Sequence, residues 1–261
     1  MTLPVPPEPP VLSDPARPRV WDVPDHPDLS DLPGLPSTLL RSVKPPAMAV
    51  LRRWWRLHVH GSDRVPASGP VILASNHLAV IDGPLIVGAS PRHTYALAKS
   101  ELFTGMVGRL LRAGGQVPVH RGITDTFAVR RCLQVLQHGH VLGVFPEGIR
   151  GLGDFSRIHC GAVYLAMVTG APIVPVAMLG TRQPGQSTRQ LPPRRSLIHI
   201  VFGDPIAIER RGWPRRHDEV VAETKAVRAQ LAAHVTDAEQ LTGLPLPGAP
   251  RGWPGPSTVG G

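Results

Sequence analysis

A histidine followed five positions later by an aspartate is a pairing suited to acid–base chemistry, because the carboxylate can orient the imidazole and stabilise its protonated form. The spacing occurs five times in this chain, so it selects no site by itself. The pairs are His26/Asp31, His58/Asp63, His77/Asp82, His120/Asp125 and His199/Asp204. Context favours His77, which follows the apolar run Val71–Ser75, and Asp82, after which Gly83 and Pro84 open a new segment.

The spacing of His77 and Asp82 constrains the backbone between them. Five residues of a continuous helix rotate by about 500°, which places the two side chains on different faces. Their contact therefore requires a turn, and we expect it at a junction between a strand and a helix. No nucleophile accompanies the pair, because the sequence has no G-x-S-x-G motif and neither Cys132 nor Cys160 follows a strand. The pair is interpreted either as a base that activates a substrate hydroxyl or as a turn histidine beside a helix-capping aspartate.

A second group of candidate residues follows the apolar run Val141–Phe145. Glu147, Gly148 and Arg150 come directly after Pro146, where the carboxyl end of a buried strand faces a ligand. Two interpretations remain open for this group: the side chains contact a ligand, or Glu147 and Arg150 form an ion pair that only braces the loop.

Two further segments complete the candidate site. The short run Gln116–Val119 leaves a pair of glycines and leads to Arg121, a side chain that can bind a phosphate. The run Ala171–Val176 has no chemically active side chain and is interpreted as a core strand.

The elements that position these residues alternate between strand and helix patterns. Strands are predicted at Val71–Ser75, Thr94–Ala98, Gln116–Val119, Val141–Phe145, Ile173–Leu179 and Leu197–Phe202. Helices are predicted at Leu102–Ala113, Thr124–Gln137, Cys160–Thr169 and Asp218–Val235. The alternation predicts an α/β fold with a mixed, largely parallel sheet covered by helices, and ligands gather at the carboxyl ends of such strands.

The folded part of the chain is predicted to span residues 47–242. Residues 1–46 contain 13 of the 31 prolines and are predicted to be a disordered tail, as are residues 243–261, which we expect to be flexible. An amphipathic helical segment, Ala47–His60, is expected at the start of the domain. Trp54 and Trp55 lie among arginines there, which favours a helix on a membrane surface, although a helix packed on the core is the alternative.

The overall composition narrows the class of partner. The 261 residues include 28 Lys and Arg against 19 Asp and Glu, a formal charge of +9 that favours nucleic acid, phosphorylated metabolites or an anionic lipid surface. Two cysteines exclude a disulfide scaffold, and no transmembrane helix or signal peptide is expected. The longest stretch without Asp, Glu, Lys or Arg, Ile158–Thr181, is broken by Gly170 and two prolines and is interpreted as a buried helix followed by a buried strand.

Together the four segments resemble the 1-acyl-glycerol-3-phosphate acyltransferase family, the lysophosphatidic acid acyltransferases and their glycerolipid relatives. The matching blocks are N-H-x4-D at Asn76–Asp82, a glycine and strand ending in arginine at Gly115–Arg121, F-P-E-G-x-R at Phe145–Arg150, and V-P-V at Val174–Val176. They occur in the order of the family over roughly residues 70–180. The chain departs from the family at Ile149, which replaces a hydroxyl residue, at His120, where an acid is common, and at Ser100, where many relatives have a second lysine.

The resemblance implies an acyltransferase that moves a fatty acyl group from acyl-CoA or acyl carrier protein to the hydroxyl of a lysophospholipid. His77 would act as the general base, with Asp82 orienting it. Arg121 and Arg150 would neutralise the acceptor phosphate, and Glu147 would position Arg150 or an acceptor hydroxyl beside Gly148. No metal or redox cofactor is implied, and the expected location is the cytoplasmic face of the cell membrane, as a peripheral or monotopic protein.

Three alternatives stay open at this stage. Acyl transfer to glycerol-3-phosphate, an acyl-amino lipid or a glycolipid is compatible with the same motifs. A basic module that binds nucleic acid or an anionic surface without catalysis is disfavoured, since no recognition pattern is present and no nucleic-acid partner is expected. A metal-dependent hydrolase using His58 and His60 is disfavoured because no H-E-x-x-H motif occurs.

Overall fold

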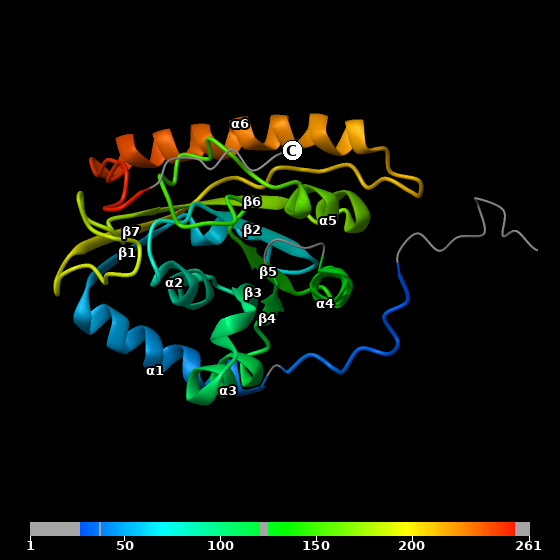
Figure 1. Cartoon of the computed structure of the whole chain (residues 1–261), viewed down its shortest axis with the longest axis horizontal. Coiled ribbons are helices and arrows are strands. Elements are labelled where there is room, and N and C mark those ends of the chain that lie inside the picture. Colours follow the sequence, from blue (N-terminus) through cyan, green and yellow to red (C-terminus); the bar gives the residue numbers. More distant parts are fainter. Residues whose placement is uncertain (1–26, 37, 121–124, 254–261) are drawn as a thin grey trace, which may run out of the picture.

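The centre of the molecule is a seven-stranded sheet with the order β1-β7-β6-β2-β5-β3-β4 (Figure 1). The structure, a computed structural model, describes residues 27–36, 38–120 and 125–253. The strands are β1 Arg56–His60, β2 Val71–Ser75, β3 Thr94–Lys99, β4 Val117–Val119, β5 Val141–Val144, β6 Ile173–Leu179 and β7 Leu197–Phe202. Every neighbouring pair is parallel except β6 and β7, so the predicted mixed, largely parallel sheet is confirmed.

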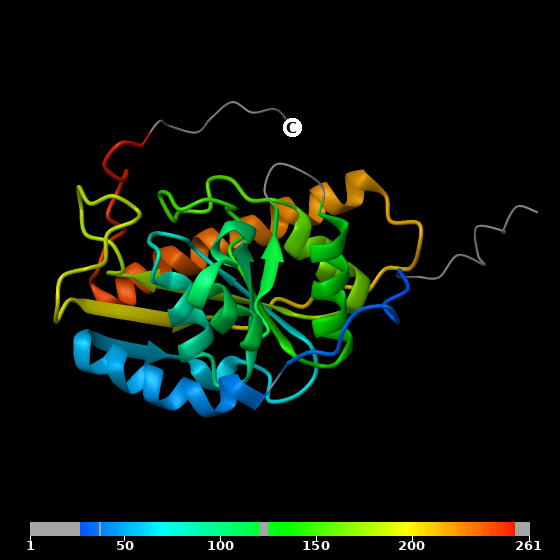
Figure 2. The same cartoon turned by 60° about the horizontal axis from the view of Figure 1, so that its bottom comes forward.

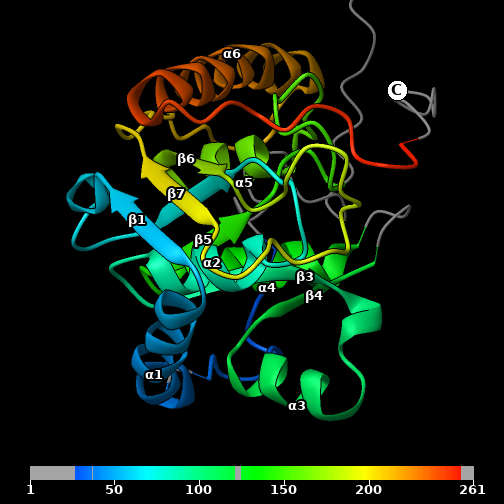
Figure 3. The same cartoon turned by 90° about the vertical axis from the view of Figure 1, so that its left-hand side faces the viewer.

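Helices cover both faces of this sheet (Figure 3). They are α1 Thr38–Trp54, α2 Asp82–Ala89, α3 Gly105–Ala113, α4 Thr126–Gln137, α5 Gly161–Thr169 and α6 His217–Thr242, with short 3-10 helices at Ser62–Arg64 and Ser100–Leu102. One apolar core joins α4, α5 and α6 to the sheet, and a second joins α1 and α2 to the opposite face. Every residue of β2 and β6 is buried, as expected for strands covered on both faces.

The predicted helix Ala47–His60 is wrong at both ends. α1 begins at Thr38 and ends at Trp54, and Arg56–His60 is the edge strand β1, paired with β7. Alternation explains the strand, because Leu57 and Val59 pack into the α1/α2 core and the residues between them face the other side. Pro45 and Pro46 lie inside α1 and are exposed, so the helix loses two amide donors on its solvent side.

The two tryptophans at the end of α1 have different environments. Trp55 is 4% exposed, and its indole N–H donates to the carbonyl oxygens of Pro192 and Pro193 at 3.0 and 3.1 Å. Trp54 is 49% exposed, with the guanidinium of Arg194 5.5 Å from the centre of its ring. Trp55 is therefore a core residue, and only Trp54 fits the predicted pair of interfacial indoles.

The predicted tails are also shorter than expected where the structure describes them. Residues 27–36 run beside α4 (Figure 2), where the Arg131 guanidinium donates to the Pro33 carbonyl oxygen at 2.5 Å. After α6, Leu244 and Leu246 pack against the core, so residues 243–253 belong to the fold. Apolar side chains spaced among the prolines anchor both segments. The remaining parts of the predicted tails, residues 1–26 and 254–261, lie outside the described residues.

Candidate active site

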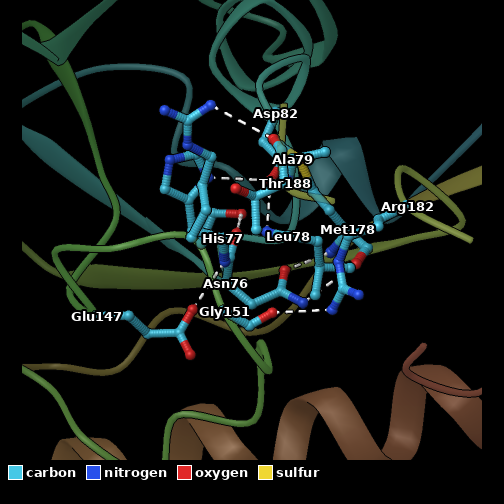
Figure 4. A network of polar contacts seen from close by, with 12 residues as sticks. Asn76, His77, Leu78, Ala79, Asp82, Glu147, Gly151, Met178, Arg182 and Thr188 are labelled. Carbon is cyan, nitrogen blue, oxygen red and sulfur yellow. Dashed lines mark hydrogen bonds and ion pairs between the residues drawn. The ribbon is translucent and has the colours of Figure 1, made fainter. Parts of the chain in front are cut away.

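The candidate site begins where β2 ends. The side-chain amide of Asn76 bonds to both main-chain groups of Met178 in β6: its nitrogen donates to the carbonyl oxygen at 3.1 Å, and its oxygen accepts from the N–H at 2.7 Å (Figure 4). Asn76 therefore continues the pairing of β2 with β6 for one more residue through its side chain. The next residue, His77, is held in a fixed position at the carboxyl edge of the sheet.

Asp82 builds the turn that follows. One carboxylate oxygen, Oδ2, lies 3.0 Å from Nδ1 of His77 and accepts the main-chain N–H groups of Leu78 and Ala79 at 2.6 and 2.8 Å. Asp82 is also the first residue of α2 and is fully buried. The predicted turn at a strand-to-helix junction is confirmed, because three donors on one oxygen bend the chain back onto the carboxylate.

The imidazole of His77 is held on several sides (Figure 4). Its main-chain N–H donates to Oε2 of Glu147 at 2.8 Å, and its carbonyl oxygen accepts from the N–H of Gly151 at 2.9 Å. The ring stacks on Phe145, with 4.0 Å between the ring centres. In the tautomer that donates its Nδ1 proton to Asp82, the other nitrogen, Nε2, is the basic one. The geometry therefore suits proton transfer at Nε2.

Glu147 supports the main chain around this imidazole. Besides His77, its carboxylate accepts the N–H of Phe155 at 3.3 Å, so each oxygen holds a main-chain N–H group. Gly148 has a φ of 69°, and a Cβ there would lie 2.7 Å from the His159 ring. Glycine is required at this position because a side chain would be strained and would collide with that ring.

Burial raises the pKa of Glu147 from 4.5 to about 7, although its hydrogen bonds to His77 and Phe155 act in the opposite direction. The unfolded chain loses this proton near pH 4.5, whereas the folded protein keeps it until about pH 7. The free energy of unfolding of the wild type should therefore fall over this range relative to Glu147→Gln. Denaturant unfolding at a series of pH values measures the difference. Glu209→Gln, which alters an exposed carboxylate, is the control, and parallel curves for Glu147→Gln and wild type would contradict the prediction.

Arg150 and Gly148 line the same cavity as His77, while Arg121 lies outside the described residues. Nη1 of Arg150 donates to the carbonyl oxygen of Thr188 at 3.4 Å. Four of the six predicted site residues, His77, Asp82, Gly148 and Arg150, thus surround one position, and Glu147 supports them from behind. The expectation that Glu147 positions Arg150 or an acceptor hydroxyl stays a prediction beside these main-chain contacts.

The cavity beside His77 is large and mainly apolar. Its volume is about 970 Å³, and it extends between α1, α2 and α3. Its apolar lining includes Leu51, Val87, Leu102, Val107, Leu110, Leu111, Val119 and Val129. Three of these residues, Leu102, Val107 and Leu110, are also exposed, so the cavity reaches the surface beside α3. A slot of this kind accepts a long hydrocarbon group next to the imidazole.

A second histidine–aspartate pair lines the same cavity. Nδ1 of His120 lies 2.9 Å from Oδ2 of Asp125, which also accepts the His120 N–H at 2.8 Å. The sequence signal for it is the same spacing directly after a strand, but His120 is exposed where His77 is buried. In the His199/Asp204 pair, which has the same spacing, the aspartate instead forms an ion pair with Arg64 at 3.5 Å.

Three histidines form a cluster at the β1/β7 edge that the sequence pattern does not predict. Nε2 of His60 lies 2.9 Å from Nδ1 of His199, and His58 stacks on His199 with 5.1 Å between the ring centres. Parallel strands in register bring the rings together, and the rings stack rather than converge on a point. Among the described residues, no group of three or more His, Cys, Asp or Glu side chains is arranged to hold a metal ion.

The sequence of this chain is similar to those of known acyltransferases. The sequence model of the family described as Acyltransferase matches residues 56–179, which span β1 to β6 and contain His77, Asp82, Glu147 and Arg150. The 1-acyl-sn-glycerol-3-phosphate acyltransferase of Bacillus subtilis is 28% identical over 185 residues, 70% of this chain and 90% of that protein. The protein of the same name from Borreliella burgdorferi is 29% identical over 130 residues, 48% of this chain and 52% of that protein.

A solved structure has the same fold. The crystal structure of the 1-acyl-sn-glycerophosphate acyltransferase from Thermotoga maritima matches with a TM-score of 0.59 and 22% identity, over 77% of this chain and 80% of that one. The α/β architecture that surrounds the candidate site is therefore shared with that protein.

Proposed function

Since this chain belongs to the acyltransferase family that includes the 1-acyl-sn-glycerol-3-phosphate acyltransferases, we propose that it transfers a fatty acyl group from a thioester to the hydroxyl of 1-acylglycerol-3-phosphate, giving phosphatidic acid. The observation that carries the proposal is the buried His77–Asp82 pair, 3.0 Å apart, at the wall of an apolar cavity that Arg150 also lines.

In the proposed mechanism His77 is both base and acid. Nε2 takes the proton of the acceptor hydroxyl while the hydroxyl oxygen forms a bond to the carbonyl carbon of the thioester. Asp82 stabilises the imidazolium that results. The tetrahedral intermediate then collapses, the carbon–sulfur bond breaks, and the imidazolium returns its proton to the departing thiolate. Acyl-CoA or acyl carrier protein supplies the thioester, and the protein supplies no redox or metal chemistry to these steps.

We assign the phosphate of the acceptor to Arg150 and Arg121. Arg150 lines the cavity close to His77, and Arg121 is assigned from the second family block alone. The acyl chain lies in the apolar cavity between α1, α2 and α3. Ile149 is exposed at the wall of this cavity and offers the acceptor an apolar contact in place of the hydroxyl common in the family.

A substrate panel tests the proposal. The purified full chain is given acyl-CoA or acyl carrier protein thioesters with 1-acylglycerol-3-phosphate, glycerol-3-phosphate, an acyl-amino lipid or a glycolipid. We expect acceptor-dependent thiol release to be fastest with 1-acylglycerol-3-phosphate and the product to be phosphatidic acid. Faster transfer to another acceptor would redirect the assignment, and thioester loss independent of any acceptor would remove it.

We further propose that the enzyme takes its lipid from an anionic membrane surface, at the cytoplasmic face of the cell membrane. The cavity mouth beside α3 is bordered by exposed apolar side chains, with Met106 at 68% exposure the most prominent. Residues 38–60 and 102–120, which contain α1 and α3, have no Asp or Glu but include the exposed arginines Arg52, Arg53, Arg109 and Arg112. Apolar side chains among cations match an anionic headgroup layer. None of the helices in the described ranges is long and apolar enough to cross a bilayer.

Met106→Asp combined with Trp54→Ala should weaken binding to vesicles that contain phosphatidylglycerol. Burial of each large apolar side chain contributes about 1.5–3 kcal/mol, so the double variant should bind at least about tenfold more weakly. Co-sedimentation at constant ionic strength measures the change. Leu241→Asp is the matched control, because Leu241 is 65% exposed on α6, across the sheet from α1 and α3 (Figure 3). Equal losses in the double variant and the control would contradict this surface.

A further inference from the structure

Arg182 is a buried cation directly behind the candidate site. It follows β6 and is 1% exposed. One of its nitrogens, Nη2, donates to the carbonyl oxygen of Gly151 at 3.0 Å (Figure 4) and to that of Gly248 at 2.6 Å. Within the described residues, its Nε and Nη1 are buried and have no hydrogen-bond partner. A buried guanidinium that binds only neutral carbonyl groups is costly, so a negative charge nearby must offset part of the desolvation.

The negative charge that acts on Arg182 is the carboxylate of Asp82. Attraction to Asp82 raises the pKa of Arg182, although desolvation, the larger effect, lowers it. The second carboxylate oxygen of Asp82, Oδ1, is likewise buried without a hydrogen-bond partner among the described residues. Both charges are buried, so they attract each other more strongly than they would in water.

Arg182 also braces the main chain of His77. The Gly151 carbonyl oxygen accepts from Arg182, and the N–H of the same glycine donates to the His77 carbonyl oxygen at 2.9 Å. The ring of Trp253 packs against Gly151, where an added Cβ would lie 2.7 Å from it. The guanidinium thus ties the loop after β6, the loop after β5 and the segment after α6 to the histidine.

We propose that Arg182 is a positioning residue for acyl transfer: it fixes the Gly151 peptide that holds His77, and it places a buried positive charge behind the His77–Asp82 pair. The inference rests on the proposed roles of His77 and Asp82. It adds a residue that lies outside the four family blocks and after the last of them.

Other charged groups also face the imidazole, and the test has to separate them. Asp82 faces it from α2, Glu147 and Arg150 from the loop after β5, and His159 from the segment before α5. On the far wall of the same cavity lie Lys99, His120 and Asp125. Because Glu147 titrates near pH 7, an activity profile alone does not identify the group responsible for a shift.

The experiment compares Arg182→Met, which removes the charge, with Arg182→Lys, which keeps it. Without the cation the imidazolium beside Asp82 is favoured, so the acidic limb of the pH profile of kcat/KM should move to higher pH by about one unit in Arg182→Met. NMR titration of the His77 ring should show the same displacement. Arg182→Lys should keep both midpoints but lose about tenfold in kcat, because one ammonium holds the Gly151 peptide less rigidly than a guanidinium.

The control is Arg131→Met, which removes a buried arginine that also donates to a main-chain carbonyl, on α4 and away from His77. It should lower the melting temperature without moving either midpoint. Unshifted midpoints in a folded Arg182→Met protein would overturn the proposal. If Arg182→Met does not fold, Arg182→Lys provides the test. A shift of its His77 midpoint by about one pH unit would then overturn the proposal. The NMR titration needs no substrate, so it separates a failure of this inference from a failure of the proposed function.

Discussion

Replacement of His77 by alanine is expected to lower kcat/KM for acyl transfer by about 10²- to 10⁴-fold, the range for loss of a positioned general base. The fold should survive, because the contacts that shape this region use the main-chain N–H and carbonyl group of His77, which alanine retains. Thiol release from acyl-CoA at saturating acceptor measures the activity, and thermal unfolding measures the stability.

His120→Ala is the comparison that makes this result decisive. In the part of the chain that the structure describes, two histidine–aspartate pairs are assembled at one cavity, with Nδ1–Oδ2 distances of 3.0 Å for His77 and 2.9 Å for His120. Only His77 is buried and stacked on a ring, so its removal should cause the larger loss. A large loss in His120→Ala beside an active His77→Ala would transfer the chemistry to the second pair.

Asp82→Asn should reduce kcat by about 10³- to 10⁴-fold, because a neutral amide lacks the negative charge that stabilises the imidazolium. The asparagine oxygen still accepts the N–H groups of Leu78 and Ala79, so the turn and the melting temperature should change little. Steady-state kinetics and thermal unfolding of the same preparation give both quantities.

Asp82→Ala separates the two duties of this carboxylate. It leaves two buried main-chain donors without an acceptor, at a cost of about 1–3 kcal/mol each, so this variant should be both inactive and less stable. If Asp82→Asn were as active as the wild type, the carboxylate would be a structural cap alone, and the proposed mechanism would lose its orienting group.

Periodicity in the sequence was sufficient for most elements of the fold. The predicted strand at Ile173–Leu179 matches β6 at both ends, and the uncharged stretch Ile158–Thr181 contains a buried helix and a buried strand as expected. These segments are buried on every side, so their composition alone reports their environment. The long helix α6 extends to Thr242, seven residues beyond its predicted end at Val235.

Errors concentrate where a segment has two possible partners. Arg56–His60 continues the arginine-rich sequence of the predicted helix, but it also alternates like a strand. Pairing with β7 makes it a strand. Trp54 and Trp55 are adjacent and identical in type, so the sequence does not tell them apart. Contact with residues 192–193 is what makes Trp55 a core residue. Packing by residues distant in sequence overrides local pattern in both cases.

The amino-acid sequence by itself determined most of the strands and helices, the four family blocks, and the position of His77 and Asp82 at a strand end, because these depend on residue types and spacings within short segments. Only the tertiary structure decided that Glu147 holds the backbone and that Arg182 lies behind the site. These contacts join residues up to 70 positions apart, such as His77 and Glu147. No local spacing encodes them, since they exist only once the sheet has brought the loops at its carboxyl edge together.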